Sequence, residues 1–137
     1  LHLLIYKNFK NIKSVVHSHS MWASIVSCLR IDIPAFHYMI AEFGGENIKC
    51  SEYATFGTKK LSANVNKALK DRKGCLMANH GQITIGEDLA ESIDLSIAME
   101  KICKQYYHCL LTNKFKILKK DQISEVLDSF KNYKIKR

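Results

Sequence analysis

Proline and glycine are scarce in this sequence, with one proline and six glycines among 137 residues. Flexible linkers are usually rich in such residues, so their scarcity leaves little room for a boundary between domains. The sequence also has no internal repeat and no low-complexity tract, and 137 residues can bury one hydrophobic core but not two. We therefore expect residues 1–137 to form a single domain.

Long apolar runs and a secretory leader are missing as well. No stretch approaches the roughly 20 apolar residues that a membrane-spanning helix needs, and the first residues do not resemble a signal peptide. The five cysteines are an odd number and form no CxxC pair, and most lie in apolar stretches, where free cysteine behaves as a small hydrophobic residue. These features predict a reduced, cytoplasmic protein with no membrane partner.

Acidic residues are fewer than basic ones, and the net charge of +8 is compatible with either a nucleic-acid partner or an anionic substrate. The lysines are scattered between Lys59 and Lys73 and gather again between Lys114 and Lys136. They form no basic stripe interleaved with aromatic residues and no nucleic-acid-binding motif. The pattern favours a solvated lysine-rich surface, and we expect no nucleic-acid partner.

The hydrophobic pattern predicts a mixture of helices and strands. Helical periodicity or capping signals predict helices over residues 1–9, 21–30, 58–70, 88–111 and 121–130, with a short helical piece in 35–43 after Pro34. Strands are predicted over residues 13–19, 47–53, 75–79 and 82–86. The short strand–turn–strand step within 75–86 indicates antiparallel pairing. The fold class is therefore α/β, with a mixed, largely antiparallel sheet and helices packed on its faces.

Two helices carry apolar stripes that should face the core. In the helix over 58–70, which Thr58 caps, Leu61, Val65 and Leu69 lie on one face. The stripe of the long helix over 88–111 is expected to consist of Leu89, Ile93, Ile97, Ile102, Tyr106 and Cys109.

The most informative local motif is His17-Ser18-His19, at the end of a predicted strand. Residues i and i+2 of a strand point to the same face, so the two imidazoles are placed to share a metal ion. Zinc accepts histidine nitrogen at about 2.0–2.1 Å and prefers four ligands. On its own the motif is equally compatible with two polar surface residues.

A third histidine strengthens the metal hypothesis. His80 follows a predicted buried strand and precedes Gly81, which permits a tight turn. Three histidines at two strand ends fit a catalytic zinc site, which has three protein ligands and an open position. The alternative is that His80 only caps the strand. His2, His37 and His108 are expected to be surface or packing residues.

Several segments together resemble one known family. VVHSHS, IPAFHYMIAEFGG, YATFGT and MANHGQIT occur in the order and at the spacing of the class II aldolase and adducin-head family. The likeness runs from residue 1 to the tail, and it is fullest to the L-fuculose-phosphate aldolases, through HYMIAEFGG and EYATFGTKKLS. The resemblance implies the C-terminal portion of a class II aldolase domain. It also implies a zinc-dependent aldolase that cleaves L-fuculose 1-phosphate to dihydroxyacetone phosphate and L-lactaldehyde through an enediolate.

The resemblance implies a role for each of six residues. His17, His19 and His80 match the zinc ligands, and Tyr38 matches a tyrosine that protonates the aldehyde oxygen across a subunit boundary. Phe56 matches a residue that shapes the aldehyde pocket, and Tyr133 a mobile tyrosine that closes over the site. The implied assembly is a homotetramer, and the apolar segment 36–43 would provide exposed contact surface for it.

The resemblance also implies that parts of the active site lie outside this chain. The family's catalytic glutamate would stand just before Leu1, and its phosphate-binding loops further upstream. We therefore expect the 137-residue chain alone to be inactive. Three alternatives stay open: a ribulose-phosphate 4-epimerase or a methylthioribulose-phosphate dehydratase of the same family, a non-enzymatic remnant or adducin-like assembly module, and a nucleic-acid-binding protein.

Overall fold

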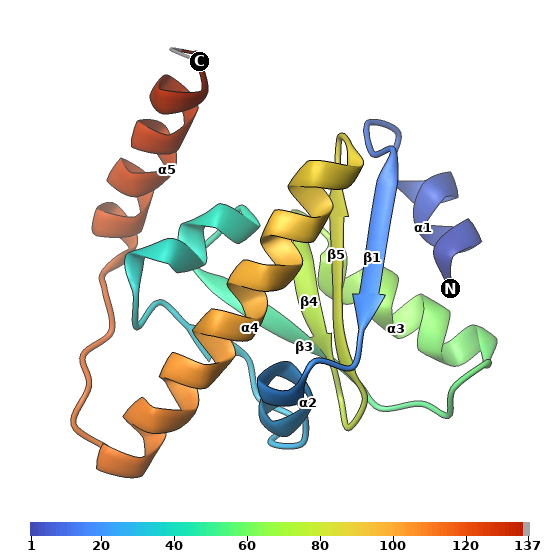
Figure 1. The fold of residues 1–137 in the computed structure, drawn as a ribbon, viewed down its shortest axis with the longest axis horizontal. Helices are drawn as coiled ribbons and strands as arrows, with labels where there is room; N and C mark the ends of the chain where they lie inside the picture. The colour runs from blue at the N-terminus through green and yellow to red at the C-terminus, as the bar shows by residue number, and fades with distance from the viewer. Residues whose placement is uncertain (136–137) are drawn as a thin grey trace.

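A five-stranded sheet forms the centre of the molecule in the computed structural model (Figure 1), which describes the backbone of residues 1–135 and the side chains of residues 1–132. The strands are β1 (Ser14–Ser18), β2 (Ile33–Pro34), β3 (Asn47–Ser51), β4 (Gly74–Met77) and β5 (Gly81–Gly86). Their order in the sheet is β1-β5-β4-β3-β2. The helices are α1 (His2–Asn8), α2 (Met21–Ser27), the 3-10 helix η1 (Tyr38–Phe43), α3 (Lys59–Leu69), α4 (Leu89–Thr112) and α5 (Lys120–Ile135).

The sheet is mixed and largely antiparallel, as the sequence predicts. β1 pairs with β5, β5 with β4, and β3 with β2, all antiparallel, whereas β3 and β4 run parallel. The parallel pair requires a crossover, and α3 lies within that connection. The predicted fold class is therefore confirmed.

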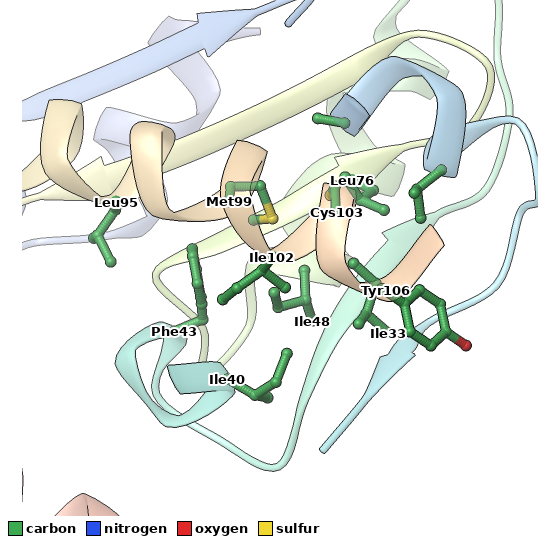
Figure 2. Close-up of a cluster of buried hydrophobic side chains, with 12 residues drawn as sticks. Ile33, Ile40, Phe43, Ile48, Leu76, Leu95, Met99, Ile102, Cys103 and Tyr106 are labelled. Carbon is green, nitrogen blue, oxygen red and sulfur yellow. The ribbon is translucent and has the colours of Figure 1, made fainter. Parts of the chain in front are cut away.

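Helices cover both faces of the sheet, so β4 and β5 are buried on both sides. Along β4, Leu76 faces a core formed with α4, α2 and η1, while Cys75 and Met77 face a second core formed with α1 and α3. Figure 1 shows α4 crossing in front of the sheet and α3 behind it. Figure 2 shows the first core, in which Met99 and Ile102 of α4 lie near the side chains of η1 and the strands.

Helix α3 begins and faces the core as predicted. The Thr58 hydroxyl accepts a hydrogen bond from the backbone N–H of Leu61 at 3.1 Å, which caps the helix. Leu61, Val65 and Leu69 are all buried. Helix α5 packs separately, against η1, through Ile123 and its neighbours.

The structure corrects four of the sequence predictions. Helix α5 continues to Ile135 rather than ending at Phe130, so much of the basic tail is helical. Strand β2, only two residues long, was not predicted. Leu89, Ile93 and Ile97 of α4 are exposed by 62%, 41% and 49%, because the helix instead turns Ser92, Leu95 and Met99 toward the sheet.

The fourth correction concerns segment 36–43. Ile40, Ala41 and Phe43 are buried within the chain itself, and Phe36 and Met39 pack partly against the first core. Only Tyr38 in this segment is an exposed large hydrophobic residue. The segment therefore does not present the broad apolar surface that the sequence suggested.

Candidate metal centre

The sheet topology brings the three predicted metal ligands to one place. His17 lies in β1, His19 is one residue beyond the end of that strand, and His80 is the last residue of the turn between β4 and β5. In the antiparallel β1–β5 ladder, Ser18 is paired with Gln82. The end of β1 therefore lies beside the start of β5, and the His80 turn lies beside His19.

The three imidazoles face one another. Their ring centroids are 4.9 Å apart for His17 and His19, 5.0 Å for His17 and His80, and 4.8 Å for His19 and His80. One ligand nitrogen from each ring can be chosen so that all lie within 4.8 Å of one another. Tetrahedral ligands at zinc–nitrogen distances are separated by about 3.3 Å. The cluster is therefore compact enough to hold a metal ion.

Gly81 allows this close approach. Its φ of +156° is rarely adopted by residues with a side chain, and a Cβ built there would collide with the carbonyl oxygen of Ser18. The same Cβ would lie 3.2 Å from Cδ2 of His19. The absence of a side chain at this position thus lets the His80 turn pack directly against the backbone that carries His19.

Hydrogen bonds fix the His17 ring and the turn that carries His80. Nδ1 of His17 donates to the backbone carbonyl oxygen of Gln82 at 2.8 Å, so Nε2 carries the lone pair. That Nε2 lies 3.2 Å from Nε2 of His19. The backbone N–H of His80 lies 3.2 Å from Oγ of Ser27 and 2.9 Å from the carbonyl oxygen of Met77, which holds the turn. A histidine whose Nδ1 donates to a carbonyl is arranged as metal-binding histidines usually are.

The surroundings of His17 and His80 favour the neutral imidazole. Burial lowers the pKa of His17, the hydrogen bond to Gln82 raises it, and the neighbouring His19 lowers it further, with a net shift downward. Burial also lowers the pKa of His80, with smaller contributions from His17 and His19. Neutral imidazole is the form that binds metal. His19 is exposed, so the cluster is accessible from solvent.

The other predicted site residues lie elsewhere. Tyr38 begins η1 and is 48% exposed; among the described side chains its ring contacts are with His37 and Phe130, not with the three histidines. Phe56 is 80% exposed, in the loop between β3 and α3. Tyr133 falls in the last part of α5, and its side chain lies outside the described residues. A single chain thus brings together the three histidines but not Tyr38.

Two polar residues around the cluster were missed by the sequence reasoning. Gln82 is 1% exposed in a strand of otherwise mostly apolar residues, and its backbone carbonyl binds His17. Glu100 of α4 accepts hydrogen bonds from the segment that follows His19. A glutamine in the predicted strand over residues 82–86 was the available signal for the first. A glutamate within a long helix gives no such signal, because most such residues are solvated.

The described part of the chain contains no helix that is both long enough and apolar enough to cross a membrane.

Comparison with known proteins agrees with the fold. Residues 1–107 match the model of the Class II Aldolase and Adducin N-terminal domain. A 5-methylthioribulose-1-phosphate/5-deoxyribulose-1-phosphate aldolase of Rhodospirillum rubrum is 42% identical over 123 residues, which cover 90% of this chain and 56% of that protein. An L-fuculose phosphate aldolase of Escherichia coli is 39% identical over 133 residues, covering 96% of this chain and 62% of that protein.

A solved structure of an L-fuculose 1-phosphate aldolase is similar with a TM-score of 0.90 and 32% identity, covering 95% of this chain and 61% of that one. The chain therefore spans 56% to 62% of the length of these relatives. The match over residues 1–107 and the identity to both aldolases lead to one conclusion: this chain belongs to the class II aldolase and adducin N-terminal domain family.

Proposed function

We propose that this chain is the metal-binding part of a zinc-dependent aldolase that cleaves a ketose 1-phosphate, with His17, His19 and His80 as the zinc ligands. The observation that carries the proposal is the convergence of the three imidazoles, with all ligand nitrogens within 4.8 Å. The donor set suits zinc, which binds neutral imidazole nitrogen and leaves an open position when only three protein ligands are present. When bound, zinc would polarise the substrate's carbonyl group and stabilise the negative charge that develops there.

The relatives support two classes of substrate. One relative is named for L-fuculose phosphate, and the other for 5-methylthioribulose 1-phosphate and 5-deoxyribulose 1-phosphate. These three compounds are all ketose 1-phosphates, and cleavage between the third and fourth carbons releases dihydroxyacetone phosphate from each of them. They differ in the aldehyde released: L-lactaldehyde, methylthioacetaldehyde or acetaldehyde. The aldehyde pocket therefore decides the substrate, and we assign a role in that pocket to Phe56, which is 80% exposed.

Two tyrosines are assigned roles: Tyr38 in proton transfer and Tyr133 in closing the site. Tyr38 would protonate the aldehyde oxygen, and because a single chain does not bring it to the histidines, it would act on the site of a neighbouring subunit in a homotetramer. Tyr133 would close over the bound substrate. Within the described residues the histidine cluster contains no carboxylate. From the resemblance to the class II aldolases, we assign the base that removes the carbon-bound proton, and the groups that bind the phosphate, to residues outside this chain.

The free cysteines support a reducing location. All five are unpaired, which fits the cytoplasm proposed here. The partners proposed are a sugar phosphate and further copies of the same chain, with neither nucleic acid nor membrane involved.

The same metal site could serve an epimerase or a dehydratase. Two observations favour the aldolase: both relatives with the identities given above are named aldolases, and the similar structure is also an aldolase. A dehydratase would release water and leave the carbon chain whole, so product analysis distinguishes dehydratase from aldolase activity.

The test is an assay of the zinc-loaded chain beside the same chain extended upstream to the length of its relatives. Each is offered L-fuculose 1-phosphate, 5-deoxyribulose 1-phosphate and 5-methylthioribulose 1-phosphate, and dihydroxyacetone phosphate is measured by coupled reduction with NADH. We expect turnover by the extended chain only, because a positioned general base is typically worth about 10²–10⁴ in rate. Equal turnover by both would mean that the base lies within residues 1–137 and that the roles must be reassigned. Loss of substrate without dihydroxyacetone phosphate would overturn the aldolase proposal.

A further inference from the structure

Glu100 of α4 binds the start of α2, the helix that directly follows His19. Its Oε2 accepts hydrogen bonds from the Ser20 hydroxyl at 2.6 Å and from the Ala23 N–H at 2.9 Å, and its Oε1 accepts from the Trp22 N–H at 2.9 Å. One carboxylate thus binds three donors of a segment 77–80 residues away in the sequence. Such charge-assisted hydrogen bonds are about twice as strong as neutral ones.

The carboxylate also sets the direction of the hydrogen bonds beyond it. A carboxylate can only accept, so the Ser20 hydroxyl donates its proton to Glu100 and has its lone pairs left for Gln82. The Gln82 side-chain Nε2 donates to Ser20 Oγ at 2.8 Å and to the carbonyl oxygen of Ser96 at 3.0 Å. The backbone carbonyl of the same Gln82 accepts the proton of His17 Nδ1. Glu100 is therefore connected to His17 through hydrogen bonds by way of Ser20 and the side chain and backbone of Gln82.

We infer that Glu100 is a positioning residue for the metal centre: through Ser20 and Gln82 it holds His17 and His19 in the arrangement that binds the ion. The inference rests on the metal site proposed above. Ser20 is the residue after His19, so a displaced Ser20 moves the backbone that carries that ligand. Gln82 is 1% exposed and fixed at both its backbone and its side chain, so it transmits the constraint to His17.

The arrangement is more than a helix cap. Helices α3 and α4 are capped locally, by the side chains of Thr58 and Asp88 at their own N-caps. The N-cap of α2 is Ser20, whose side chain makes no capping hydrogen bond, because its hydroxyl lies between Glu100 and Gln82. Helices α3 and α4 thus use caps from their own N-cap residues, whereas the start of α2, beside the histidines, is bound by a carboxylate from a different element.

The test compares zinc affinity and cobalt spectra of four proteins: wild type, Glu100→Gln, Ser20→Ala and the control Asp88→Asn. Zinc affinity is measured by competition with a chromophoric chelator, and the visible spectrum of the Co²⁺ form reports ligand geometry. Neutralising Glu100 places an amide NH₂ against a donor of α2. We expect zinc binding to weaken about 10–100-fold, as for other groups that orient metal ligands, with an altered cobalt spectrum. Asp88→Asn removes a helix-capping charge from α4, the helix that also carries Glu100. This control should change neither the zinc affinity nor the cobalt spectrum.

Urea unfolding of the metal-free proteins separates positioning from general stability. A second control, Thr58→Ala, removes the α3 cap and should lower stability while leaving zinc affinity within about twofold of wild type, because the ring contacts and hydrogen bonds described for the three histidines involve other elements than α3. If Glu100→Gln does not fold, Ser20→Ala decides, since it breaks the same connection with a smaller change. Wild-type affinity and an unchanged cobalt spectrum in the folded variants would overturn the inference and leave the metal site standing. Failure of the wild type to bind zinc would overturn both.

Discussion

Nδ1 of His17 lies 2.8 Å from the backbone carbonyl oxygen of Gln82, and this hydrogen bond decides which nitrogen of the ring is available to a metal. The carbonyl can only accept, so the proton stays on Nδ1 and the lone pair of Nε2 points to the side of His19, whose own Nε2 is 3.2 Å away. The β1–β5 ladder that carries this bond is therefore part of the proposed metal centre.

Removal of one ligand should abolish tight zinc binding. Replacing His80 with alanine leaves two imidazoles, and we expect zinc affinity to fall more than about 100-fold, beyond the 10–100-fold typical of residues that only orient ligands. Isothermal titration with Zn²⁺ measures the zinc affinity of each variant. His108→Ala is the matched control, because His108 is exposed on α4, its Nδ1 lies 2.8 Å from the Lys104 carbonyl of the same helix, and its ring contacts Trp22 and Tyr107. Equal losses in the two variants would contradict the assignment.

Gly81→Ala should destabilise the fold more than Gly57→Ala. Both glycines have a positive φ, +156° and +80°, but a Cβ at Gly81 would collide with the Ser18 carbonyl whereas one at Gly57 has nothing within 4 Å. Left-handed backbone alone costs a residue with a side chain about 1–2 kcal/mol, and forced overpacking adds about 1–3 kcal/mol. Urea denaturation should show the destabilisation caused by overpacking only in Gly81→Ala. A similar free energy of unfolding for both variants would mean that the turn can move away from β1.

The sequence predicted the fold and the convergence of the three histidines better than it predicted the residues that hold these histidines in place. Strand periodicity placed His17 correctly, and the glycine after His80 indicated the turn. The stripe of α4 failed at Leu89, Ile93 and Ile97, because the first half of that helix has more than one apolar set and only packing on the sheet selects Leu95 and Met99. Glu100 could not be assigned, since its partners are about 80 residues distant and nothing local distinguishes it from a solvated glutamate.

The cysteines should differ in reactivity, and the more buried thiols should react more slowly. Burial, and secondarily Asp32, raise the pKa of Cys50 from 9.0 to about 11, so its reactive thiolate remains the minor form at pH 9. We expect its alkylation rate to keep rising about tenfold per pH unit up to pH ~10.5, because below the pKa the thiolate fraction increases tenfold per unit. Exposed Cys28 should react first at pH 8, and buried Cys75 and Cys103 only after unfolding. Mass spectrometry of alkylated peptides measures each rate. A plateau for Cys50 near pH 9 would contradict the raised pKa.

The assignment of Tyr38 to a neighbour's site can be tested by mixing inactive subunits. In the upstream-extended chain, Tyr38→Phe and His80→Ala should each lower activity, the second more strongly. Dissociated and reassembled together, they should regain part of the activity, because some sites then combine an intact Tyr38 with an intact histidine cluster from the next subunit. Reassembly of each variant with itself is the control, and sedimentation verifies the oligomer. Mixed oligomers that regain no activity, or a monomer that is fully active, would refute the shared site.

The histidines of the cluster come from two distant segments that are joined here by one strand pairing and one turn. An ion bound to all three would act as a removable cross-link between them, present in the folded state and absent from the unfolded one. The stability of the chain would then depend on metal supply: free zinc at 100 times its dissociation constant adds about 2.7 kcal/mol to the free energy of unfolding. A cell short of zinc would hold less of this protein folded, so metal supply would set its abundance as well as its activity.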